Sequence, residues 1–144
     1  MATEEQLQSD LHAAMKARAS EKVYVLRGLI TAIKNLKVEK QAATLAEADI
    51  AVLVRKEISK RAEAAEFARQ AKRADLVQSN ESEKAILEAY LPTQLSVQAL
   101  ETIIKDLASE LGTTQIGPLM ARLRERYAGQ FDGKTASELI RKLA

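Results

Sequence analysis

The sequence predicts an all-α protein with a four-helix N-terminal domain, residues 1–91, and a small three-helix C-terminal domain, residues 92–144. The first observation is compositional: the 144 residues are rich in alanine, glutamate, lysine, leucine and arginine and include only two prolines. The second is that apolar residues recur at helical spacing in seven segments. The third is Pro92, which ends the fourth predicted helix and marks the predicted domain boundary.

The first two helices are predicted from Thr3 to about Arg18 and over residues 21–41. Thr3 and Ser20 have hydroxyl side chains, which accept hydrogen bonds from backbone N–H groups at helix N-caps. The predicted apolar faces are Leu7, Leu11, Ala14 and Met15 in the first helix, and Val23, Leu26, Ile30, Ile33 and Leu36 or Lys37 in the second. Gly28 costs a helix interior about 1 kcal/mol relative to alanine, and a close helix crossing is one explanation for it.

The third helix is predicted to be the longest, over residues 45–72. Thr44 and Glu47 fit a capping box, in which each side chain bonds the other's free backbone N–H. Glu57 and Arg61 have the i,i+4 spacing of a favourable ion pair. The apolar stripe shrinks from branched residues to alanines along the helix: Ile50, Val54, Ile58, Ala62, Ala65 and Ala68.

A fourth helix is predicted from about Asp75 to Leu91, because proline cannot continue the hydrogen-bonded helix beyond that residue. Its apolar residues are Leu76 at one end and Ile86, Leu87, Tyr90 and Leu91 at the other. Four helices with short connections indicate a bundle or a pair of helical hairpins.

Three shorter helices are predicted after Pro92, over residues 96–111, over residues 115–127, and from Asp132 or Gly133 to the C-terminus. Ser96 is the expected N-cap of the first, and Gly112 suits the residue after its last turn. The expected core residues are Leu100, Ile103, Ile104, Leu107, Ile116, Leu119, Met120, Leu123, Ala136, Leu139, Ile140 and Leu143.

No residue pattern predicts a catalytic, metal or cofactor site. The chain has no cysteine, and it lacks the phosphate-loop, dinucleotide and zinc-protease motifs. His12 is predicted to be a helix-surface residue, while Ser20, Ser96 and Ser109 are predicted to be caps or helix ends. The acidic N-terminus does not resemble a signal peptide, and no apolar run is long enough to span a bilayer. We therefore expect a cytoplasmic protein without membrane contact.

Basic residues give the candidate binding surfaces, although the net charge of +2 does not by itself imply nucleic-acid binding. One set lies on the long third helix and the turn after it, and the other in the C-terminal domain: Arg61, Arg69, Lys72 and Arg73, and Arg122, Arg124, Lys134 and Arg141. A further run, Arg27, Lys34, Lys37 and Lys40, falls on neighbouring turns of the second helix.

Two readings of these basic residues stay open. Like charges at i,i+4 and nearby glycines favour phosphate binding. The alternative is a solvated face neutralised by Glu57, Glu63 and Glu66, with the glycines acting as turn residues. Aromatic residues make up only 3% of the chain, so an RNA would be bound through its shape and backbone, without a stacking platform.

Five motifs in order resemble the GatB/YqeY family, most closely its free-standing YqeY-type members, over essentially the whole chain. They are KEISKR from Lys56, KRADL from Lys72, EAYLPTQLS from Glu88, IGPLMARL from Ile116 and FDGKTASELIRKL from Phe131. The YLPTQLS junction and the C-terminal motifs are specific in combination. Phe131 departs from the commoner pattern before the Asp-Gly-Lys sequence.

The resemblance implies the same two helical domains and a role related to tRNA. In the B subunit of the tRNA-dependent amidotransferase, similar domains form the tail that engages the tRNA body. That enzyme amidates misacylated tRNA with glutamine-derived ammonia, ATP and magnesium, in a large separate domain for which this chain has no room. The resemblance thus implies a tRNA-binding appendage without the catalytic part, and only by analogy a carbon–nitrogen ligase with glutamine as amido-N-donor. The alternative is an adaptor that docks on an aminoacyl-tRNA synthetase or amidotransferase subunit and binds no nucleic acid.

Overall fold

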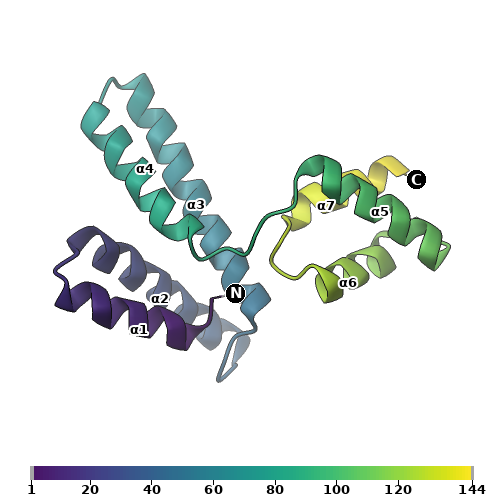
Figure 1. The fold of residues 1–144 in the computed structure, drawn as a ribbon, viewed down its shortest axis with the longest axis horizontal. Helices are drawn as coiled ribbons and strands as arrows, with labels where there is room; N and C mark the ends of the chain where they lie inside the picture. Colours follow the sequence, from purple (N-terminus) through teal and green to yellow (C-terminus); the bar gives the residue numbers. More distant parts are fainter. Residues whose placement is uncertain (1, 144) are drawn as a thin grey trace. The chain divides into compact units, whose positions relative to one another are not determined.

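The computed structural model describes residues 2–143, which form seven α-helices and no strand, and the predicted all-α class is confirmed (Figure 1). The helices are α1 (Glu4–Lys16), α2 (Ser20–Lys40), α3 (Glu47–Gln70), α4 (Ala74–Glu88), α5 (Val97–Leu111), α6 (Ile116–Arg126) and α7 (Gly133–Leu143). The chain divides into two compact units, with the boundary between Leu91 and Pro92.

The first unit consists of two helical hairpins, α1–α2 and α3–α4, joined where α2 packs against both α3 and α4 (Figure 1). Its core is made of branched side chains contributed by all four helices, among them Leu7, Leu26, Leu29, Ile33, Ile50, Val54 and Leu87. Tyr90 donates a hydrogen bond from its hydroxyl to Asp10 of α1 at 2.6 Å, which ties the end of the α4 segment to the first helix. Burial and the Asp10 carboxylate raise the pKa of the Tyr90 phenol above its usual value.

In the outer half of the α3–α4 hairpin, small side chains and polar pairs replace the branched core residues. There Ala65 and Ala68 are the buried residues of α3, and small side chains allow close helix contact but bury little apolar area. Arg69 of α3 bonds Glu81 of α4 across the hairpin. Polar pairs thus supplement a thin apolar contact in this half.

The second unit packs α5, α6 and α7 around one apolar core. Phe131, the residue that departs from the family pattern, is buried in this core. The segment before α5 is fixed to the α6–α7 loop, because the Leu95 N–H donates to the Gln130 carbonyl and the Gln94 side-chain amide donates to the Gly129 carbonyl, each at 2.8 Å.

Three of the predicted helix ends are confirmed. Thr3 accepts a hydrogen bond from the Gln6 N–H at 3.2 Å, and Ser96 accepts one from the Ala99 N–H at 3.0 Å. Gly112 follows α5 with a φ of 65°, the left-handed conformation that glycine adopts without strain.

Three other predictions about helix ends were wrong. The capping box at Thr44 does not form, because α3 begins two residues later and Ala46 occupies its N-cap without a side-chain bond. Ser20 is already the first residue of α2, and Ala19 is the N-cap. Helix α4 ends at Glu88, so the last residues before Pro92 form a turn and not a continued helix.

The predicted apolar faces are largely buried, with four exceptions. Met15 is 45% exposed, Leu76 is 42% exposed and Ile116 is 40% exposed, and Ala62 is exposed as well. Val25 and Leu29 of α2, which the predicted stripe omitted, are buried. A single stripe underestimates α2 because this helix packs against α1, α3 and α4.

Gly28 does not mark a close helix crossing, since a Cβ atom added there would meet no atom within 4 Å. We expect Gly28→Ala to stabilise the protein by about 1 kcal/mol, because alanine has the higher helix propensity and the space is open. Urea unfolding measures this difference. Gly112→Ala serves as the contrasting variant and should destabilise, because its φ of 65° disfavours a side chain. A loss of stability in Gly28→Ala would contradict the prediction.

Candidate nucleic-acid interface

Arg61, the first of the predicted phosphate-binding residues, lies between α3 and α4 as part of an ion-pair network. Its guanidinium bonds Glu57 one turn earlier on α3, and its Nε lies 3.6 Å from Glu83 of α4. All three side chains are only 15% exposed. Arg61 therefore contributes to the contact between the two helices, and its charge is already compensated.

We expect Arg61→Met to destabilise the protein by about 2 kcal/mol, because it removes the cation between two poorly solvated carboxylates and leaves Glu57 with the exposed Lys60 as a partner. Urea unfolding of the variant measures the loss. The triple variant Arg61→Met, Glu57→Gln, Glu83→Gln removes the uncompensated charge and should recover most of the stability. If Arg61→Met were as stable as the parent chain, the network would have no structural role.

The other predicted residues of the α3–α4 hairpin differ in whether a neighbouring carboxylate neutralises their charge. Arg69 bonds both Glu66 and Glu81, and Arg73 bonds Asp75. These hydrogen bonds raise the pKa of each arginine and lower the pKa of Asp75. Lys72, in the turn between α3 and α4, is exposed and has no ion pair within residues 2–143.

In the second unit, Arg122 is neutralised together with a neighbour that the prediction left out. Arg122 and Arg126 lie one turn apart on α6, and both contact Glu110 of α5, at 3.4 and 2.7 Å. The hydrogen bond from Arg126 lowers the pKa of the Glu110 carboxyl. This cluster connects α5 to α6. The sequence of α6 did not predict these ion pairs, because the pairing depends on how α5 and α6 are aligned.

Three predicted residues of the second unit keep their charge available, and we call them the C-terminal basic patch: Arg124, Lys134 and Arg141. Each is exposed, and none has an ion pair within the described part of the chain. Lys134 and Arg141 are seven residues apart, so they lie on the same face of α7 two turns from each other.

Arg124 lies on α6 and faces away from the Glu110 cluster. It is two residues from both Arg122 and Arg126, which places it about 200° around the helix from the Glu110 cluster. It follows Met120 by one turn, and the Met120 Cε atom is 4.0 Å from a Cβ position built on Gly133, the residue before Lys134. The contact between α6 and α7 at Met120 and Gly133 therefore lies one turn from Arg124 and one residue from Lys134.

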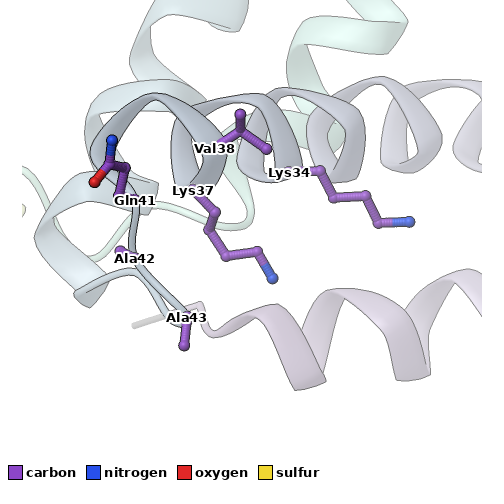
Figure 2. A pocket seen from close by; sticks show the side chains of 6 residues that line it. All are labelled: Lys34, Lys37, Val38, Gln41, Ala42 and Ala43. Atoms are coloured by element: carbon purple, nitrogen blue, oxygen red, sulfur yellow. The ribbon is translucent and has the colours of Figure 1, made fainter.

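The basic residues of α2 also include both paired and unpaired cations. A shallow pocket at the end of α2 is lined by Lys34, Lys37, Val38, Gln41, Ala42 and Ala43. Figure 2 shows the side chains of Lys34 and Lys37 extending from the same side of the helix. Lys37 bonds both oxygens of Glu4 at 2.9 Å, and Lys40 bonds Asp49. Lys34 is exposed and forms no ion pair with any described residue.

Within residues 2–143, no group of three or more histidine, aspartate or glutamate side chains is arranged to hold a metal ion. None of the helices in the same range has the length and apolar character needed to cross a membrane.

Comparisons with known proteins place the chain in a family. Residues 4–143 match the sequence model of the family described as Yqey-like protein. The chain is also similar to "Altered inheritance of mitochondria protein 41, mitochondrial" of Lachancea thermotolerans, with 33% identity over 108 residues. The match covers 73% of this chain and 57% of that protein, so it spans less than two thirds of the relative's length. With nearly every described residue inside the matched range, the chain belongs to the YqeY-like protein family.

Proposed function

We propose that this protein binds tRNA through the C-terminal basic patch and has no catalytic role in tRNA amidation. The observation that carries the proposal is the unequal pairing of the basic residues. The three predicted arginines of the α3–α4 hairpin and Arg122 are neutralised by carboxylates of the same unit, whereas Arg124, Lys134 and Arg141 are exposed and unpaired within residues 2–143.

Unpaired, exposed cations on two packed helices of a small unit suit the phosphate backbone of a nucleic acid. A cation already bonded to a carboxylate must lose that partner before it binds a phosphate. A free cation exchanges only water and small ions, and the counterions released from the RNA drive the association. The patch presents three such cations from two packed helices, which matches the regular charge of a folded RNA better than that of a single small anion.

The scarcity of aromatic side chains supports recognition by shape and charge. Tyr127 and Phe131 are the aromatic residues nearest the patch in sequence, and Tyr127 is half-buried against the core while Phe131 is buried in it. Base stacking therefore contributes little to this surface, and selectivity would come from the shape of a structured RNA. A compact RNA such as tRNA provides phosphates at fixed relative positions.

The family relationship supports the same class of ligand. The GatB/YqeY resemblance extends over both units, and in the amidotransferase B subunit the similar domains form the tail that engages tRNA. The chemistry of that enzyme lies in a separate domain, so the resemblance supports a role in binding and not in catalysis.

Binding of total tRNA to the purified protein across a salt series tests the proposal. We expect log Kd to rise with log salt with a slope of about 3, corresponding to roughly one unit for each phosphate contact of the patch. A matched series with a polyglutamate of similar charge controls for nonspecific attraction of an anion. No binding of tRNA at low salt would refute the proposal and favour a protein–protein adaptor.

A further inference from the structure

The end of the α1–α2 hairpin carries a concentrated positive charge that the proposed tRNA surface does not use. Between His12 and Arg27 the chain has four cations and a single carboxylate, Glu21. Glu21 accepts a hydrogen bond from Ser82 of α4. The four cations, Lys16, Arg18, Lys22 and Arg27, form no ion pair with any residue that the structure describes.

The same end contains an open groove of about 630 Å³, which we call the α1–α2 groove. It is lined by Met15, Arg18, Ser20, Val23, Tyr24 and Arg27. Tyr24 is 65% exposed and Met15 is 45% exposed, which leaves two large apolar surfaces beside two unpaired arginines. The Arg27 guanidinium lies 4.0 Å from the Met15 sulfur, so a charged and an apolar side chain meet inside the groove.

The groove continues along the outer face of α2. Exposed residues follow one another at alternating steps of three and four: Tyr24, Arg27, Thr31, Lys34 and Val38. None of them is acidic, and Val38 is 79% exposed. With a rise of about 1.5 Å per residue, this stripe is about 21 Å long, the length of four helical turns.

We infer that the α1–α2 groove and this stripe bind an acidic peptide segment with bulky apolar side chains. The arginines pair with its carboxylates in the two-bond geometry that a guanidinium favours. An aliphatic or aromatic side chain of the peptide fills the space beside Met15 and Tyr24. The length of the stripe fits a helical segment of about 14 residues, or an extended one of about six, better than a small molecule.

The composition of the groove favours a peptide over RNA. Methionine, tyrosine and arginine are enriched at protein–protein interfaces, whereas lysine is depleted there, and both cations that line the groove are arginines. An RNA backbone would leave the apolar surfaces of Met15 and Val23 without a partner. The C-terminal basic patch, by contrast, has no exposed apolar residue among its members.

Phage display of random 16-residue peptides against the full-length protein tests this inference. We expect enriched peptides to contain at least two aspartates or glutamates around a leucine, phenylalanine or tryptophan. Synthetic copies should bind Tyr24→Ala and Arg27→Glu at least about tenfold more weakly than the parent chain. Both side chains are exposed, so neither change should disturb the fold.

Matched control variants are available on α3, where Val52 is 50% exposed and Lys56 is exposed. Val52→Ala and Lys56→Glu repeat the loss of apolar surface and the charge reversal outside the groove, and they should leave peptide affinity unchanged. Failure to enrich any peptide, enrichment of peptides without acidic residues, or equal binding to the groove variants would overturn the inference. A drop in tRNA affinity with unchanged peptide affinity in Tyr24→Ala and Arg27→Glu would also overturn it, because the groove would then be an RNA surface.

Discussion

Reversal of all three charges of the C-terminal basic patch, by Arg124→Glu, Lys134→Glu and Arg141→Glu together, is expected to weaken tRNA binding by about a thousandfold, at roughly tenfold for each lost phosphate contact. Each substitution replaces an attraction to a phosphate with a repulsion. The salt dependence should flatten at the same time, because fewer counterions are released. Both effects are measured in one fluorescence titration series at several salt concentrations.

The control for this experiment must change the net charge equally without touching the patch. Lys56→Glu, Lys60→Glu and Lys105→Glu together do so on α3 and α5, and we expect their tRNA affinity to fall by less than about tenfold, through long-range repulsion alone. Circular dichroism checks that both triple variants keep their helices. Equal losses in the two variants would mean that tRNA responds to overall charge and that the patch is not its binding surface.

Truncation of Leu123 to alanine is expected to cost about 3 kcal/mol, the largest stability effect of a single substitution that we predict. Leu123 is fully buried between the three helices of the second unit. A single core of about 50 residues rarely supplies more than about 3–5 kcal/mol of stability. We therefore expect most of the folding free energy of this unit to be lost.

Hydrogen exchange measured by mass spectrometry on the full-length protein locates this effect. Peptides from α5, α6 and α7 should exchange much faster in Leu123→Ala than in the parent chain. Val97→Ala is the matched control, because Val97 lies in the same unit but is 54% exposed. Unchanged exchange in the Leu123 variant would show that the core of the second unit is less essential than its packing indicates.

The sequence predicted the helices well because their apolar periodicity and their breaks are local properties. Pro92 and Gly112 each favour a backbone conformation that ends a helix, so each predicts a helix end close to it. The Thr44 capping box failed because the same four-residue pattern occurs where the chain does not yet turn into a helix. The start of α3 was instead set two residues later, in a loop whose course depends on how α2 and α3 pack.

The candidate interface was only partly predictable, for a different physical reason. Sequence spacing revealed the Glu57–Arg61 pair, which lies within one helix. It did not reveal the contacts of Arg61 with Glu83, Arg69 with Glu81 or Arg126 with Glu110, since each joins two helices and depends on their relative alignment. Only the structure therefore separated cations that stabilise the fold from cations that remain available to a ligand.

The hydrogen bond between Tyr90 and Asp10 has a consequence for the order of events on the ribosome. Its partners are 80 residues apart, and the core of the first unit likewise needs Leu7 from α1 and Leu87 from α4. At about 5–20 residues per second, the nascent chain needs roughly 4–16 s to extend from one partner to the other. During this interval the α1–α2 hairpin has left the exit tunnel without its covering helices. The incomplete unit therefore exposes its apolar residues until α4 has been synthesised.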